Sequence, residues 1–111
     1  SLLGFHKLSG DGDKVDFVYE RASGTTASKT DVATLVADTY IKLGFRYSGN
    51  TKTVSLFVDG AEVASKRVSA TTTAATPWPN DYMAPMIATM QVDGTTGMTP
   101  TVDWWACAQY E

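Results

Sequence analysis

The stretch that most constrains the fold of this chain is residues 54–63, VSLFVDGAEV. Two runs of alternating apolar residues meet at Asp59-Gly60. An Asp-Gly pair between such runs is the strongest short signal for a two-residue type I′ hairpin turn, because both central positions require positive φ. The turn predicts three cross-strand pairs on one face: Val58 with Ala61, Leu56 with Val63, and Val54 with Ser65.

The residues just before this hairpin predict a third strand. Residues 40–47 carry apolar side chains at every second position, which is the period of a strand. A four-residue loop over 48–51 would place this strand against 54–58 and make the apolar faces of all three segments coincide. The register is strongly specified, because a slip of one residue would turn an apolar face outward. The predicted pairs are Ile41 with Val58, Leu43 with Leu56, and Phe45 with Val54.

A second hairpin is predicted at the start of the chain. The segments SLLGFHKL and KVDFVYER flank the turn SGDGD. Turn residues between two apolar runs are typical of a hairpin. The predicted pairs are Leu3 with Tyr19 and Phe5 with Phe17.

The rest of the chain reads as further short strands and loops. We interpret residues 22–30 as a loop, 32–36 as a short strand and 69–81 as a long Thr/Ala/Pro connection. Two more strands are predicted, over 86–92 and 101–110. One apolar face of the last strand is formed by Val102, Trp104, Ala106 and Ala108. With no helical periodicity of useful length, the pattern indicates a single all-β domain over residues 1–111, an antiparallel β-sandwich.

Composition narrows the classes of partner. The net charge is −3, and the nine basic residues are scattered rather than clustered, so no nucleic-acid partner is expected. No apolar run approaches the length of a membrane span, and no leader resembles a signal peptide, so no membrane partner is expected either. Cys107 is the only cysteine, which excludes an intrachain disulfide. Its small apolar neighbours predict a buried thiol.

The segment TYIKLGFRYSGNTKTVSLFVDGAEVASKRV resembles the central strands of concanavalin A-like and laminin G-like jelly rolls. The closing stretch TVDWWACAQY is similar to their last strand. The resemblance covers residues 35–111 and implies a jelly-roll sandwich. Such domains carry extra strands before the region where this chain begins. Those strands are therefore expected to be absent, to be supplied by a neighbour, or to lie outside the sequence at hand. The matching positions are Phe45, Tyr47, Gly49, Val54, Leu56, Phe57, Val58, Asp59, Gly60, Val102, Asp103, Trp104 and Tyr110.

Glycosidases with this fold use alternating acidic residues as nucleophile and acid. Asp16 and Glu20 are the nearest equivalent here. Four residues along a strand separate them by about 13 Å, too far for either usual carboxylate spacing. We therefore predict that the chain is not an enzyme and has no catalytic residues. Asp11-Gly12-Asp13 lacks the rest of a calcium loop, and neither a metal site nor a cofactor is expected.

Trp78 is a candidate ligand-binding residue. It lies between Pro77 and Pro79, which could present its indole outward to stack on a sugar ring, with Asn80 and Asp81 bonding hydroxyl groups. Tyr82 completes this candidate set. The alternative is that the indole caps one open end of the sandwich, burying a large apolar area.

Trp104 and Trp105 are candidate interface residues. Neighbouring residues of a strand point to opposite faces, so one ring belongs to the core and the other needs a different cover. A partner subunit would provide that cover. The chain's own loops or its second sheet are the alternative.

These observations favour a non-enzymatic structural module that packs against other protein subunits, in a homo-oligomer or a virion. The acidic, cysteine-poor, Thr/Ala/Gly-rich composition resembles decoration and tail-associated proteins of tailed bacteriophages, which implies a virion or extracellular location. A lectin-like module that binds glycans is the alternative. A glycoside hydrolase fragment is the third and least favoured hypothesis.

Overall fold

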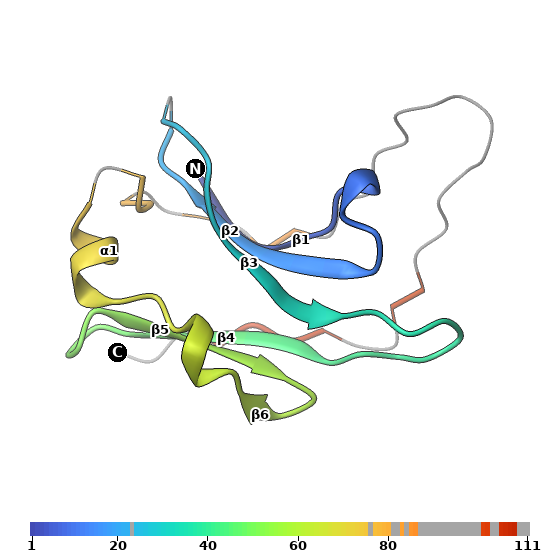
Figure 1. Cartoon of the computed structure of the whole chain (residues 1–111). Coiled ribbons are helices and arrows are strands. Elements are labelled where there is room, and N and C mark those ends of the chain that lie inside the picture. The colour runs from blue at the N-terminus through green and yellow to red at the C-terminus, as the bar shows by residue number, and fades with distance from the viewer. Residues whose placement is uncertain are drawn as a thin grey trace.

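The computed structural model describes residues 1–22, 24–75, 77–80, 83, 85–86, 101–102 and 105–108. These residues form two three-stranded antiparallel sheets, in the orders β1-β2-β3 and β4-β5-β6, and one short α-helix (Figure 1). The sheets lie one above the other and approach each other where β3 passes β5. The prediction of an all-β chain is confirmed.

The first sheet contains the predicted N-terminal hairpin. β1 (Leu2–His6) pairs with β2 (Lys14–Glu20), and the observed pairs Leu3–Tyr19 and Phe5–Phe17 are the predicted ones. Apolar residues at every second position of both strands place these side chains on the face that looks toward the other sheet. Local pattern and turn chemistry were sufficient to fix this hairpin.

The third strand of this sheet corrects the prediction of a loop over 22–30. β3 (Ala27–Thr34) begins within that range and ends before the predicted limit at Val36. Its first residues, ASKT, carry no apolar alternation, because β3 lies at the edge of the sheet and its backbone pairs with the apolar β2. A bulge interrupts the pairing: Asp31 has a φ of 54°, and its N–H donates to Asp16 Oδ1 at 2.8 Å.

The second sheet contains the Asp-Gly hairpin. β5 (Thr53–Val58) and β6 (Ala61–Glu62) are joined by Asp59 and Gly60, whose φ values of 51° and 83° are the two positive values that the sequence predicts. Val58 pairs with Ala61, and the Val63 N–H donates to the Leu56 carbonyl at 2.8 Å, as predicted. The third predicted pair is wrong. A 3-10 helix, η2 (Ala64–Lys66), takes up three residues, so Val54 pairs with Val68.

The register between β4 (Leu43–Ser48) and β5 differs from the prediction by two residues. The ladder continues to Ser48 and Thr53, so the loop covers 49–52 rather than 48–51, and Ile41 falls outside the strand. Lys52, at the end of the loop, has a φ of 52°. A shift of two residues keeps every side chain on its predicted face. The observed inward pairs are Leu43–Val58, Phe45–Leu56 and Tyr47–Val54.

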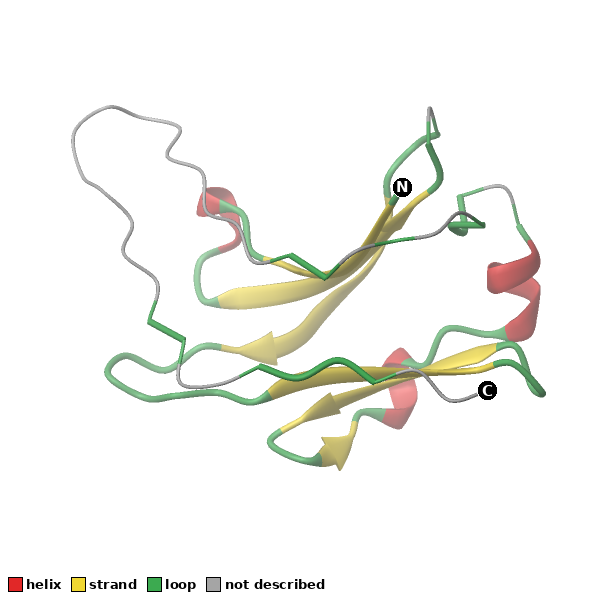
Figure 2. Ribbon diagram, turned by 180° about the vertical axis from the view of Figure 1, so that it is seen from behind, coloured by secondary structure: helices red, strands yellow, loops and turns green. Residues whose placement is uncertain are grey.

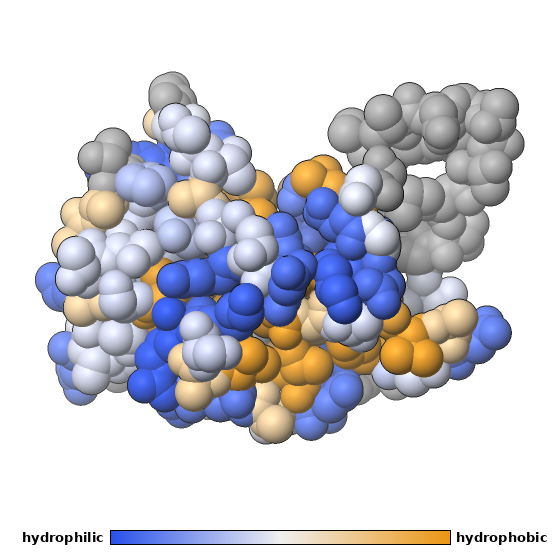
Figure 3. Space-filling view, in the orientation of Figure 1, coloured by the Kyte–Doolittle hydropathy of each residue, from blue (hydrophilic) through white to orange (hydrophobic). Residues whose placement is uncertain are grey.

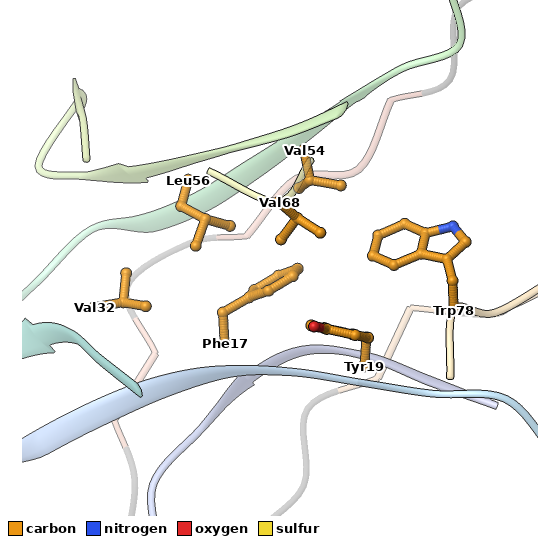
Figure 4. Close-up of a cluster of buried hydrophobic side chains, with 7 residues drawn as sticks. All are labelled: Phe17, Tyr19, Val32, Val54, Leu56, Val68 and Trp78. Atoms are coloured by element: carbon orange, nitrogen blue, oxygen red, sulfur yellow. The ribbon is translucent and has the colours of Figure 1, made fainter. Parts of the chain in front are cut away.

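The core fills the space between the two sheets (Figure 4). Phe17 rises from β2 toward Leu56 and Val54 of β5, and all three are completely buried. The Phe17 ring lies 5.4 Å from that of Phe5, in an edge-to-face arrangement, and 5.3 Å from that of Phe45. The complete buried cluster is Phe17, Tyr19, Val32, Val54, Leu56, Val68 and Trp78.

A short helix, α1 (Ala70–Ala74), lies in the predicted irregular connection over 69–81. Ser69 caps it by accepting the Thr72 N–H at 3.2 Å. The Thr73 hydroxyl donates to the Lys52 carbonyl at 2.5 Å, which ties the helix to the β4–β5 loop. Periodicity could not reveal a helix of five residues.

The C-terminal predictions are tested only in part. Of the predicted strand over 86–92, only Met86 is described. In the segment 101–110, the described residues 101–102 and 105–108 are not in a strand and are exposed. Cys107 is among them, so the prediction of a buried thiol is wrong. Within the described ranges, no helix has the length and apolar character needed to span a membrane.

The outer face of the second sheet carries an ion pair. Arg67 donates from Nη2 and Nε to Glu62 Oε1, at 2.6 and 2.9 Å. Hydrogen bonds from Arg67 and then Ser55, with the charges of Arg67 and Arg46, hold the pKa of Glu62 below its ordinary value of 4.5. The carboxylate is therefore favoured by the folded state more than by the unfolded state.

This ion pair predicts a pH dependence of stability. Since the folded pKa is depressed, the contribution of Glu62 is present above pH 4.5 and is lost as the pH falls through the folded pKa. Unfolding midpoints of the wild type and Glu62→Gln should therefore differ at neutral pH and converge in acid. Arg67→Gln is expected to flatten the same dependence. A constant difference between wild type and Glu62→Gln at all pH values would contradict this role.

Candidate interaction surface

Trp78 lies inside the core, at one end of the sandwich. Trp78 is only 8% exposed, and its ring centroid lies 5.5 Å from that of Tyr19 on β2 and 6.0 Å from that of Tyr47 on β4. Figure 4 shows the indole in the space between the two sheets. The Trp78 carbonyl accepts a hydrogen bond from Arg21 Nε at 3.0 Å. Trp78 thus links the sheets through its ring and fastens its own segment through its backbone.

This position corrects the expectation of an outward-facing indole at Trp78. A sugar ring stacks on an open aromatic face, and here that face is covered by two tyrosines. Asn80 is exposed, two residues away. Asp81 and Tyr82 lie outside the described residues, so the remainder of the candidate sugar site stays a prediction.

Of the two candidate interface residues, the structure describes only Trp105. It is 61% exposed, while Trp104 lies outside the described residues. The neighbouring described residues Ala106, Cys107 and Ala108 are exposed as well. An indole in this position presents a large apolar area to solvent, as the interface hypothesis requires.

Phe45 and Tyr47 are half exposed on β4, which sequence reasoning did not anticipate. They are 43% and 47% exposed although both point toward the other sheet. The centroid of the Phe45 ring lies 6.4 Å from that of Phe5 and 5.3 Å from that of Phe17. The cause is the place of β4 at the edge of its sheet, which alternation of residues cannot reveal.

Other large apolar side chains are also exposed among the described residues. Figure 3 shows apolar surface gathered over the lower sheet. The exposed large apolar residues are Leu2, Leu8, Val36, Tyr40, Phe45, Tyr47, Met83, Met86, Val102 and Trp105.

The described residues offer little chemistry of other kinds. They contain no group of three His, Cys, Asp or Glu side chains that could hold a metal ion. A shallow hollow of about 420 Å³ is lined by Asp38, Thr39, Tyr40 and Thr101.

Burial raises the pKa of Tyr19, which keeps this core hydroxyl protonated.

Comparison with known proteins was made by sequence and by structure. No protein-family model, no curated protein and no solved structure matches the chain.

Proposed function

We propose that this protein is a non-enzymatic structural module that packs against other protein subunits. The observation that carries the proposal is the 61% exposure of Trp105. Tryptophan is enriched among the residues that dominate binding energy at interfaces, where its large apolar area becomes buried. Among the described residues, the exposed aromatics of β4 add to the same argument.

We further propose that the module is a jelly-roll sandwich of the concanavalin A-like kind, carried on the surface of a virion or on another extracellular assembly. Support for the fold comes from the hairpin of β5 and β6, in which Asp59 and Gly60 adopt the turn that the resemblance implies. Support for the location comes from composition, which is acidic and poor in cysteine. The carbohydrate-binding alternative is weakened by the burial of Trp78.

Association in solution tests this proposal. The mass of the chain is measured by sedimentation equilibrium over a concentration series, alone and with the products of neighbouring genes. We expect a complex whose dissociation constant rises at least about thirtyfold in Trp105→Ser, because truncating a hot-spot residue costs about 2 kcal/mol or more. The unfolding midpoint should not change, because Trp105 is exposed.

Tyr40→Ser is a matched control, since Tyr40 is 67% exposed and lies in a different segment. It should leave the dissociation constant unchanged. A chain that stays monomeric at every concentration and binds none of the neighbouring products would overturn the proposal.

A further inference from the structure

The outer side of β4 presents a row of backbone hydrogen-bonding groups. The Asp59 N–H donates to the Lys42 carbonyl at 2.8 Å, and hydrogen-bonded pairs alternate along an antiparallel ladder. The backbone groups of Leu43, Phe45 and Tyr47 therefore point away from β5. In the part of the chain that the structure describes, no strand pairs with this side of β4. Such a row is a template for one further strand.

The chain's own residues 105–108 lie along this side of β4. Figures 1 and 2 show them on its outer side, in front of the strand in Figure 2. Among the described residues, no backbone hydrogen bond joins them to β4, and they are not in a strand. The sequence nevertheless predicts a strand over 101–110, from its alternation of apolar side chains. A segment with the pattern of a strand thus lies beside an edge that accepts one.

The direction of this segment follows from the position of Thr101. Thr101 lines one hollow together with Asp38, Thr39 and Tyr40, which come just before β4. From there, residues 105–108 run along β4 in the same direction as β4 itself (Figure 2). The two segments are therefore parallel. A parallel pair needs a connection of about a dozen residues or more, and residues 49–100 supply it.

Equal steps along both segments set the register. Counting forward in equal numbers from Tyr40 and Thr101, which share the hollow, brings Ala106 beside Phe45. Directly opposite residues of neighbouring strands point to the same face, so Ala106 joins Phe45 on the inner face. Trp105 then points outward, in agreement with its 61% exposure. A shift of one residue would turn its indole inward, between the sheets.

This register satisfies the outward backbone groups of β4. In a parallel pair, a residue bonds to the two residues that flank its opposite partner. The Phe45 N–H therefore donates to the Trp105 carbonyl, and the Phe45 carbonyl accepts the Cys107 N–H. By the same rule, the Trp105 N–H donates to the Leu43 carbonyl, and the Tyr47 N–H donates to the Cys107 carbonyl. The row from the Leu43 carbonyl to the Tyr47 N–H is then bonded throughout.

The same register places Trp105 beside Gly44 on the outer face. Among the described residues, a Cβ at Gly44 would meet only the Phe57 Cβ, at 4.0 Å, so the space beside this glycine accommodates an indole. An aromatic side chain next to an edge glycine stabilises a sheet and helps to fix its register. Side-chain packing and backbone pairing therefore favour the same arrangement.

We propose that residues 105–108 form a strap that closes onto β4 as a fourth, parallel strand of the second sheet. Cys107 lies opposite Arg46 and Trp105 lies opposite Gly44, both on the outer face. The inference goes beyond the proposed function, because it closes the edge of β4 within one chain and fixes the exposed indole on a sheet. A binding side chain that is fixed in advance loses less conformational entropy when a partner binds.

Disulfide trapping within one chain tests the register. Cys107 is exposed and provides one thiol, and Arg46→Cys provides the other. Opposite residues of neighbouring strands lie about 4.8 Å apart, within disulfide range. Gly44→Cys and Ser48→Cys are matched controls on the same face, each about 8 Å from Cys107, which is beyond that range. Each variant is oxidised at low concentration, and its free thiols and its mass are measured.

We expect Arg46→Cys to lose its free thiols while keeping the mass of one chain, and both controls to keep their thiols. Equal trapping at all three positions, or trapping at none of them, would overturn the proposal. So would preferential trapping in Gly44→Cys or Ser48→Cys, because the register would then differ. A disulfide between two chains would overturn it as well, since a second copy would then occupy the edge.

Amide hydrogen exchange of the wild type tests the pairing without any substitution. The closed strap slows exchange at the Phe45, Tyr47, Trp105 and Cys107 amides. The Ala106 N–H points away from β4 and exchanges rapidly, which makes the expected pattern along the strap an alternating one. Exchange at Trp105 and Cys107 as fast as at Ala106 would contradict the pairing.

These outcomes are separable from those of the proposed function, because both measurements are made on the unassociated chain. If the strap does not pair but association persists and depends on Trp105, only the strap is refuted. If the strap pairs but the chain associates with no subunit, only the proposed function is refuted.

Discussion

Phe17→Ala is expected to lower the free energy of unfolding by about 3–5 kcal/mol, the range for truncating a buried Phe to alanine. Phe17 is completely buried and makes ring contacts with Phe5 on its own sheet and Phe45 on the opposite one. Its loss leaves a cavity at the point where the two sheets share their apolar faces. Since a domain of this size is stable by only about 5–15 kcal/mol, the variant should be close to unfolding at ambient temperature.

Urea unfolding followed by tryptophan fluorescence measures this effect. Phe17→Leu is the milder variant that keeps the measurement possible if the alanine variant does not fold. Tyr40→Ala is the control, because Tyr40 is 67% exposed and its truncation should change stability by no more than about 0.5 kcal/mol. Equal losses at the two positions would mean that the two sheets do not share the core seen between them.

Trp78→Ala is expected to be comparably damaging, at about 3–5 kcal/mol. The indole lies against Tyr19 and Tyr47 and so joins the two sheets at one end. Trp78→Phe should recover part of the loss, because an aromatic ring still fills much of the space. The measurement is the same urea unfolding.

The same variants separate the core role of Trp78 from the carbohydrate hypothesis. Glycan-array binding is measured for the wild type, Trp78→Ala and Trp78→Phe, the last of which should remain folded. The core role predicts reduced stability and no specific glycan binding to lose. Wild-type stability in both variants, together with glycan binding that Trp78→Ala abolishes, would show instead that the ring serves a sugar.

The hairpins were predictable because their information is local. Asp59-Gly60 specifies positive φ at both positions, and alternation in β1, β2 and β5 specifies the inward face. Even the wrong β4–β5 register kept the correct faces, because the side-chain period is two and the error was two residues. The position of the four-residue loop was the weak point, because Ser48 was predicted to lie in the loop and instead pairs with Thr53.

Edge strands and isolated segments were not predictable in the same way. The polar first residues of β3 show no apolar alternation that would predict a strand. An edge strand with exposed side chains is held by backbone pairing with its neighbour, here β2, and needs no such alternation. Cys107 has the small apolar neighbours of a core thiol, yet its described segment lies outside both sheets and is exposed.

The candidate interaction surface likewise has features that local sequence determines and features that depend on the tertiary structure. The sequence by itself determined the turn at Asp59-Gly60, the inward faces of the hairpin strands, and the presence of two aromatic candidates at Trp78 and Trp105. Only the tertiary structure decided that Trp78 is buried between the sheets, that Trp105 is exposed, and that β4 lies at the edge of its sheet among the described strands. Dihedral preference and side-chain period act within a few residues, whereas the burial of a ring depends on strands that are distant in the chain.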